Sequence, residues 1–340
     1  MTQYECLDGL RRAEGGATLA WMRIVSLLPA ATEILYAVGA GNAVVGVTHE
    51  CDFPAEAAKK PALIRPRVDP SALPAEVDRQ VRELVGRGEN IYALDTELLL
   101  RLQPDLIVTQ DLCDVCAVSA EDLATALSRF PAGNRPRVVS FTPRSLDDIW
   151  KGVREIAQAA DCASEGRALA ESLALEAATV RQAVADAAPR PRVLCLEWFD
   201  PPYAAGHWVP EMVRLAGGID VLGREGAPSF GIQWQEAISA QPEILLLMSC
   251  GYDLERNIHV WRSTNLPPGW EEVPAVRNDR VYAVDANVYF SRPGPRLSEG
   301  LALLAALLHP TRARTDWASK PASVRRVTSE TPSLRAKPAG

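Results

Sequence analysis

The residue types best suited to metal chemistry lie in two polar segments, each directly after a predicted strand. They are His49, Glu50, Cys51, Asp52, Cys113 and Cys116. If the two strands are neighbours, both segments meet at one edge of a sheet, and three thiols with one imidazole form a ligand set for zinc or an iron–sulfur centre. The alternative is that Cys113 and Cys116 are small buried residues in a turn, because a single Cys-x-x-Cys pair is a weak signal and free cysteines are often buried.

A second candidate segment carries alternating aromatic and polar side chains after another predicted strand. It covers residues 197–203, with Trp198 near its start, and continues to His207 and Trp208. Aromatic rings in a loop offer a flat apolar wall, and such walls line ligand pockets. The alternative is that these rings pack beneath the loop, because large rings also fill small satellite cores.

A third candidate segment, residues 287–296, leaves a predicted strand and enters the last helix. Tyr289 and Phe290 can stack on a flat ligand, while Arg292 or Arg296 can bind a carboxylate, an amide or a phosphate. For Arg296 the alternative is an ion pair with a nearby acid. Together the second and third segments favour a planar ligand over a bare ion.

The elements that must position these segments occur twice along the chain. Residues 103–108 and 241–246 share the pattern Gln-Pro-acid followed by three apolar residues, and a second apolar run follows each copy. Buried strands that alternate with helical periodicity predict α/β architecture. The repetition therefore indicates two similar α/β lobes with a ligand-binding cleft between them.

The residue pattern divides the chain into five parts. They are an N-terminal extension over residues 1–21, a first α/β lobe over 22–162, a linking helix over 163–189, a second α/β lobe over 190–310 and a disordered basic tail over 311–340. The linking helix is predicted to be a rigid spine, because Gly and Pro are absent from most of its length. The tail holds seven Lys or Arg against two Asp or Glu, which is typical of disorder.

The composition excludes several classes of protein. Of the 340 residues, 47% are hydrophobic and 23% are charged, which is ordinary for a soluble globular chain, and the net charge of −7 argues against nucleic acid as a partner. No run approaches the roughly 18 to 20 apolar residues that a membrane helix requires. Residues 1–21 do not form a secretory signal, so we expect a cytoplasmic location, or a periplasmic one if translation starts elsewhere. The scatter of seven cysteines also fits a reducing compartment.

Sequence motifs for catalysis are absent from the chain. There is no Gly-rich phosphate loop, no Gly-x-Ser-x-Gly elbow and no nucleophile with a suitably spaced base and acid. We therefore expect a binding protein and not an enzyme. The enzyme hypothesis that remains is a metalloenzyme in which the cysteines hold zinc or an iron–sulfur centre and Glu50 or Asp52 acts as acid or base.

The chain resembles a known family over residues 23–309. The resemblance is carried by residues 23–33, 45–47, 52–54 and 103–107, and by Phe290, Arg292, Pro295 and Arg296. In order and spacing these residues are similar to the cobalamin-binding branch of the periplasmic substrate-binding proteins of ABC importers. The resemblance implies a type III periplasmic-binding-protein-like fold, in which two Rossmann-like α/β lobes are joined by a single long helix and close little around the ligand.

The resemblance also implies a function. A monomer would bind cobalamin or another corrinoid in the cleft and deliver it to an ABC permease, which docks onto acidic residues of the binding protein. Carried over by position, the ligand-binding residues are His49, Glu50, Trp198, Trp208, Tyr289 and Phe290, with the corrin ring lying flat across the aromatic residues. Asp52, His207 and Arg292 complete the candidate set from the same segments. A siderophore, haem or a free metal ion are alternative ligands for the same cleft.

Two departures from the family pattern bear on these expectations. Transport members carry a signal peptide or lipid anchor, which residues 1–21 do not resemble, so a role in intracellular corrinoid handling stays open. Where relatives often have an aromatic residue in the first-lobe loop, this chain has residues 49–51, His-Glu-Cys. We therefore hypothesise that His49 or a nearby thiol replaces the weak lower ligand of the corrinoid, since imidazole and thiolate both bind metals of this kind.

Overall fold

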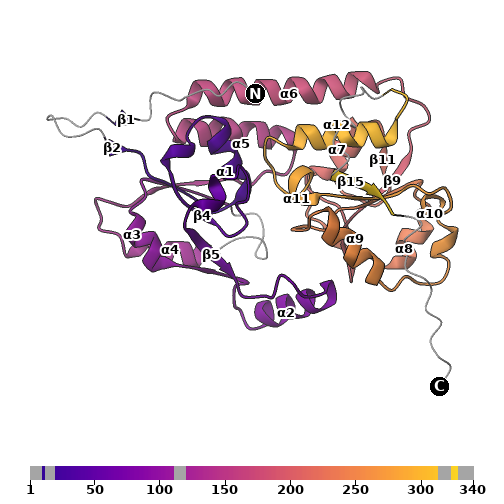
Figure 1. Cartoon of the computed structure of the whole chain (residues 1–340), viewed down its shortest axis with the longest axis horizontal. Coiled ribbons are helices and arrows are strands. Elements are labelled where there is room, and N and C mark those ends of the chain that lie inside the picture. The colour runs from indigo at the N-terminus through magenta and orange to yellow at the C-terminus, as the bar shows by residue number, and fades with distance from the viewer. Residues whose placement is uncertain (1–9, 12–19, 111–119, 313–322, 328–340) are drawn as a thin grey trace.

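The computed structural model describes residues 10–11, 20–110, 120–312 and 323–327, which form two α/β lobes. Figure 1 shows the lobes side by side beneath one long helix that runs along both of them. The first lobe is built on a six-stranded sheet and the second on a seven-stranded sheet. The structure confirms the predicted fold of two α/β lobes joined by a single long helix.

The sheet of the first lobe has the strand order β6-β5-β4-β3-β7-β8. Its strands are β3 Ile24–Ser26, β4 Val44–Thr48, β5 Ala62–Pro66, β6 Tyr92–Leu94, β7 Leu106–Thr109 and β8 Arg137–Ser140. The helices of this lobe are α1 Pro29–Ala37, α2 Pro74–Gly86, α3 Thr96–Leu102, α4 Ala120–Ser128 and α5 Leu146–Ala159. Neighbouring strands are parallel except for β5 and β6, and the central strands β3 and β7 are buried throughout, as strands covered by helices on both faces must be. A separate antiparallel pair joins β1 Leu10–Arg11 to β2 Ala20–Trp21.

The sheet of the second lobe has the order β12-β10-β9-β13-β14-β15, with β11 also paired to β9. Its strands are β9 Arg192–Phe199, β10 Pro202–Ala204, β11 Ile219–Asp220, β12 Phe230–Gly231, β13 Ile244–Leu247, β14 Val281–Val284 and β15 Val324–Arg326. Its helices are α7 Val209–Leu215, α8 Trp234–Ser239, α9 Leu254–Ser263, α10 Pro274–Arg277, α11 Ala286–Tyr289 and α12 Leu297–Leu308. Strands β9, β13 and β14 run parallel, so the loops after β13 and β14 emerge at the same edge of the sheet.

The long helix between the lobes is α6, Ala163–Ala183, with 21 residues. Its buried residues are Gly166, Ala170, Leu173, Ala177 and Val180, which recur every three or four positions and so lie on one face. A Cβ atom at Gly166 would lie 2.2 Å from the Cβ of Ala157, so glycine allows α5 and α6 to approach closely. The helix begins at the predicted residue 163 but ends at Ala183, six residues before the predicted end at 189. In the described part of the chain no helix combines the length and apolar character that crossing a bilayer requires.

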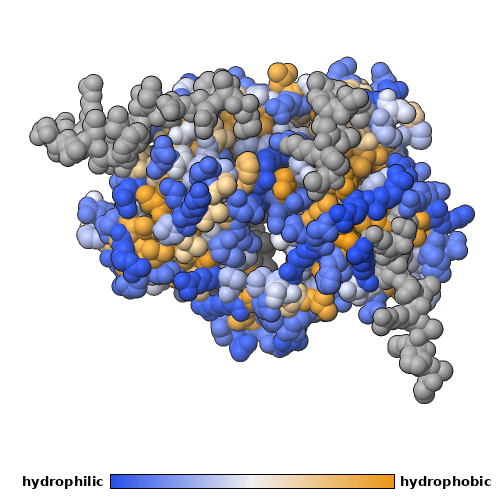
Figure 2. All heavy atoms as spheres, viewed as in Figure 1, coloured by the Kyte–Doolittle hydropathy of each residue, from blue (hydrophilic) through white to orange (hydrophobic). Residues whose placement is uncertain are grey.

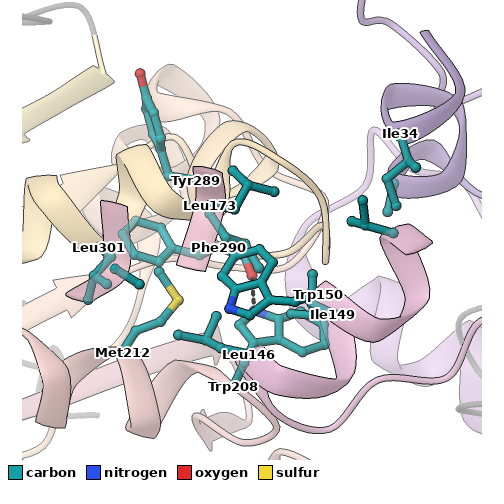
Figure 3. Packing of buried hydrophobic residues seen from close by; sticks show 14 of the residues in the cluster. Ile34, Leu146, Ile149, Trp150, Leu173, Trp208, Met212, Tyr289, Phe290 and Leu301 are labelled. Atoms are coloured by element: carbon teal, nitrogen blue, oxygen red, sulfur yellow. Dashed lines mark hydrogen bonds between the residues drawn. The ribbon is translucent and has the colours of Figure 1, made fainter. Parts of the chain in front are cut away.

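One hydrophobic cluster extends through both lobes along α5, α6 and α12, which we call the spine helices. It includes Ile34 and Trp150 from the first lobe and Met212 and Leu301 from the second, all at most 6% exposed. Figure 3 shows Trp150 in the centre beside Trp208, with Ile34 on one side and Met212 and Leu301 on the other. Because moving the lobes apart would expose this shared core, the spine helices hold them as one packed body.

The C-terminal tail differs from its predicted disorder over residues 323–327. Strand β15 adds an antiparallel edge to β14, and Val327 is 0% exposed in the core of the second lobe. Arg325 donates to both carboxylate oxygens of Glu255, at 3.2 and 2.6 Å. The basic composition that suggested disorder instead provides ion pairs for an edge strand.

We predict that Val327→Ala lowers the free energy of unfolding by about 1.5 kcal/mol, because two buried methyl groups are lost. Urea denaturation followed by circular dichroism measures this change. The matched control is Val85→Ala on α2, where the side chain is 48% exposed and the change should stay within about 0.5 kcal/mol. Equal effects of the two substitutions would contradict docking of β15 in solution.

Candidate functional site

The candidate segments lie where the two lobes face each other beneath the spine helices. The loops after β4 and β14 meet across the lobe boundary, and Figure 2 shows a hollow between the lobes on the face displayed. Two sets of residues connect the lobes at this boundary. We call them the inner bridge, which lies next to the shared core, and the outer bridge, which joins the first-lobe segment before α2 to α9.

The inner bridge is a network of carboxylates and guanidinium groups. Arg296 Nε donates to Oε2 of Glu33 at 2.8 Å, and its Nη2 donates to Oε1 of the same carboxylate. Arg292 Nη2 donates to Oδ2 of Asp52 at 3.1 Å and to the main-chain oxygen of Glu50 at 2.9 Å. The Glu33 side chain is 2% exposed, so its charge requires both guanidinium groups from the other lobe.

The outer bridge contains an aromatic pair in the second lobe. The rings of Trp198 and Tyr252 lie 5.2 Å apart, and the guanidinium carbon of Arg256 lies 4.3 Å from the centre of the Tyr252 ring. Arg256 Nη2 also donates to the main-chain oxygen of Ala72 at 2.9 Å, and Ala72 belongs to the first lobe. Figure 1 shows α2, which starts just after this contact, beside α9. Aromatic and cationic surface therefore borders the space between the lobes.

Three of the aromatic residues predicted to bind a ligand lie in the core. Trp208 is 6% exposed, Tyr289 4% and Phe290 2%, and all three belong to the cluster shared by the lobes. The indole Nε1 of Trp208 donates to the main-chain oxygen of Phe290 at 2.8 Å, as the dashed line in Figure 3 marks. The expectation that a flat ligand lies across these rings is therefore corrected, because their faces are covered by protein. Trp198, which is half-buried, remains a candidate stacking surface.

The two histidine candidates have different surroundings. His49 is exposed, with its ring 5.8 Å from that of Tyr92, and the neighbouring Glu50 is exposed as well. His207 is half-buried and has a φ of 51°, a left-handed conformation that its main-chain bonds to Ala227 and Gly226 hold in place. Burial, with a smaller contribution from Arg144, lowers the pKa of His207, so its imidazole is neutral and able to bind a metal.

Two half-buried acids, Glu197 and Asp220, lie beneath the loop that carries His207. Glu197 accepts a hydrogen bond from the main-chain nitrogen of Gly206 at 3.2 Å, and burial raises the pKa of Glu197 to about 7. Asp220 accepts from the main-chain nitrogen of Gly223 at 2.7 Å, and burial raises its pKa to about 6. The charge of Asp220 further raises the pKa of Glu197, and both carboxylates raise the pKa of the Cys195 thiol. Through these hydrogen bonds the two carboxylates fix the main chain of the segment around His207.

The predicted cysteine cluster can be placed only in part. Cys51 is 3% exposed, and its sulfur lies 3.1 Å from the hydroxyl of Thr32 and 3.5 Å from that of Thr48. Burial raises the pKa of Cys51, which disfavours the thiolate that binds metals. Cys113 and Cys116 lie outside the described residues. Among the residues that the structure does describe, no group of three or more His, Cys, Asp or Glu could hold a metal ion.

Three residues of the site were not identified from the sequence. Glu33 lies in α1 within residues 23–33, which carry the family resemblance without a role for Glu33, and Tyr252 and Arg256 follow β13 without any motif. The position of Tyr252 and Arg256 after the carboxyl end of a parallel strand was the available signal, because ligands bind at that edge of open α/β sheets.

Comparison with known proteins supports the fold and identifies a family. A family described as periplasmic binding protein matches residues 24–288. A vitamin B12-binding protein of Vibrio cholerae is 27% identical over 301 residues, which cover 84% of this chain and 88% of that protein. A solved periplasmic heme-binding protein from Roseiflexus sp. RS-1 in apo form has a TM-score of 0.64 and 26% identity, covering 86% of this chain and 99% of that one. The solved periplasmic vitamin B12-binding protein of Vibrio cholerae has a TM-score of 0.63 at 22% identity, covering 86% and 98% of the two chains, and supports the fold alone.

These matches confirm one expectation and contradict another. The resemblance to cobalamin-binding periplasmic proteins is confirmed by the matched family and by the B12-binding relative. The expected cytoplasmic location is wrong, because the matched family is one of periplasmic binding proteins.

The inner bridge generates a prediction about stability. Glu33→Gln should lower the free energy of unfolding by about 3 kcal/mol, because it leaves the guanidinium groups of Arg292 and Arg296 without their buried counter-charge. Thermal and urea unfolding measure the change. Glu83→Gln is the matched control, since Glu83 pairs with Arg79 on the surface at 51% exposure and should contribute less than about 1 kcal/mol. A change at Glu33 no larger than that of the control would refute the role given to the inner bridge.

Glu197 and Asp220 generate a prediction about the pH dependence of stability. The folded protein holds protons on Glu197 and Asp220 that the unfolded chain releases at lower pH, since their pKa values of about 7 and about 6 lie above the ordinary 4.5 and 3.8. The stability contributed by these groups is therefore fully present below about pH 4 and is lost as the pH rises to about 7.

The test compares unfolding free energies at pH 5 and pH 8 in the parent and in Glu197→Gln. The parent should lose about 2 kcal/mol more than the variant over this range. Glu97→Gln, at a side chain that is 67% exposed, should behave like the parent. Identical slopes in the parent and in Glu197→Gln would show that Glu197 is not protonated in the folded protein.

Proposed function

The chain belongs to the periplasmic binding protein family, and we propose that it is the solute-binding component of an ABC importer that holds a corrinoid between its two lobes. The observation that carries the choice of ligand is the half-buried ring of Trp198, which packs against the buried Tyr252, with Arg256 at the boundary between the lobes. A corrin is a broad ring with an apolar face and a polar rim. Aromatic faces complement the ring, and a guanidinium group complements the rim.

The relatives support this choice of ligand. The Vibrio cholerae relative, at 27% identity over most of both chains, is a vitamin B12-binding protein. We infer that this chain binds a solute without transforming it, because its family is one of periplasmic binding proteins. In this role the acidic chain, with a net charge of −7, would dock onto basic residues of a permease.

The packing of the lobes favours a site that is largely formed before the ligand arrives. The spine helices and the inner bridge both cross the lobe boundary. Wide opening of the lobes would therefore expose the shared hydrophobic core and separate the buried charge of Glu33 from its arginine partners. We therefore propose that the ligand enters a cleft whose walls move little. Small adjustment remains possible at the outer bridge, where a single hydrogen bond joins Arg256 to Ala72.

Haem is the second candidate ligand, and one residue favours it. His207 presents a neutral imidazole, which is a common axial ligand of haem iron, from a fixed main-chain conformation. The Roseiflexus relative, a heme-binding protein, is 26% identical to this chain. Haem and corrinoids share a flat metal macrocycle, so the aromatic pair is compatible with either.

We predict that the purified protein binds cyanocobalamin at one saturable site and that Trp198→Leu weakens binding about tenfold or more, because it removes a stacking ring. Isothermal calorimetry and visible absorption measure the affinity, with hemin titrated in parallel. Trp234→Leu is the matched control: this ring is also half-buried in the second lobe but packs on Trp270, 5.2 Å away, and its loss should leave the affinity unchanged. If hemin binds saturably and cyanocobalamin does not bind, haem is the ligand and the corrinoid assignment is wrong. If neither binds, the proposed function is rejected.

A further inference from the structure

Among the described residues, Arg256 differs from Arg292 and Arg296 in having no carboxylate within ion-pair distance. Arg292 and Arg296 are both bound by acids of the inner bridge. Arg256 is half-buried, yet within the described ranges no Asp or Glu oxygen lies within 4.0 Å of its guanidinium group. A cation that has lost part of its water without gaining a counter-charge is an unusual arrangement in a folded protein.

The acids nearest to Arg256 are engaged elsewhere. Asp253, at the start of α9, accepts the main-chain nitrogen of Arg256 at 2.8 Å and so caps the helix. Glu255 is bound by Arg325. Asp69, in the facing segment of the first lobe, accepts the main-chain nitrogen of Ser71 at 2.8 Å and its hydroxyl at 2.6 Å. Hydrogen bonds from Ser71, with a smaller contribution from Arg256, lower the pKa of Asp69, and no ion pair within 4.0 Å joins Arg256 to any of these three acids.

The guanidinium group is oriented by neutral contacts. Its face lies against the Tyr252 ring at 4.3 Å, and Nη2 reaches the main-chain oxygen of Ala72 at 2.9 Å and the hydroxyl of Tyr252 at 3.5 Å. Its Nε is buried and has no acceptor in the described part of the protein. Stacking and two hydrogen bonds from Nη2 thus fix the plane of the group, while Nη1 makes no hydrogen bond among the described residues. A guanidinium group held in this way is suited to bind a planar or tetrahedral oxyanion.

We propose that Arg256 determines specificity by binding an oxyanion, a carboxylate or a phosphate, on the rim of the macrocycle that stacks beside Trp198. The inference rests on the proposed function, since it assigns a recognition role within the same cleft. Two ligands offer this chemistry from different sources. A complete corrinoid carries a phosphodiester in its nucleotide loop, and a porphyrin carries propionate carboxylates.

The test uses ligand pairs that differ in the oxyanion. The full-length parent and Arg256→Gln are titrated with cobalamin and with cobinamide, which lacks the nucleotide loop and its phosphate. They are also titrated with hemin and with hemin dimethyl ester, in which both carboxylates are blocked. Dissociation constants are measured at low and high salt. Arg326→Gln is the matched control, because this cation also lies over a tyrosine ring of the second lobe, at 5.7 Å from Tyr282, but on the edge strand β15.

In the ligand pair that the parent binds, Arg256→Gln should weaken the oxyanion-bearing member about tenfold or more and the other member less than about twofold. The loss should shrink at high salt, and Arg326→Gln should match the parent. The pair that shows the effect identifies the source as phosphate or carboxylate. Equal losses for both members of a pair would show that Arg256 only joins the lobes, and no loss for either would also overturn the inference. A parent that binds none of the four macrocycles would instead reject the proposed function on which the inference rests.

Discussion

The arrangement of the two lobes depends on one buried carboxylate. Glu33 lies in the first helix of the first lobe, and its charge is neutralised by Arg292 and Arg296 from the last loop of the second. Removing such a charge from water is unfavourable unless its partners are in place, so the first and last parts of the fold must meet. The hydrophobic cluster under the spine helices extends the same junction. Together they make two lobes into a single body with a preformed boundary.

This junction decides which residues remain for a ligand. The cations of the inner bridge are already neutralised, and the rings of Trp208 and Phe290 are enclosed in the core. On the outer side of the boundary, the Trp198 side chain is only half-buried, and Arg256 lacks a carboxylate partner among the described residues. Recognition of a macrocycle is therefore assigned to the outer side, and alignment of the lobes to the inner side.

The sequence predicts the fold better than the site. The repeated Gln-Pro-acid pattern before β7 and β13 identifies two lobes, because buried parallel strands require continuous apolar runs. Tyr289 and Phe290 were misassigned, since an aromatic residue after a strand can face either a cleft or a core and only tertiary packing distinguishes the two. The contact of Arg256 with Ala72 spans 184 residues of sequence, so no local pattern could reveal it. Residues 324–326 form strand β15 against the expectation from their composition, and the neighbouring Val327 is buried in the core of the second lobe.

The most direct test of the central claim, that a metal macrocycle is held between the lobes, is a crystal structure of the protein grown with saturating cyanocobalamin. We expect the corrin in the cleft, with one face against Trp198 and with the contacts of Glu33 to Arg292 and Arg296 unchanged from the ligand-free protein. A corrin bound outside the cleft, or lobes rotated so that the inner bridge is broken, would contradict this expectation.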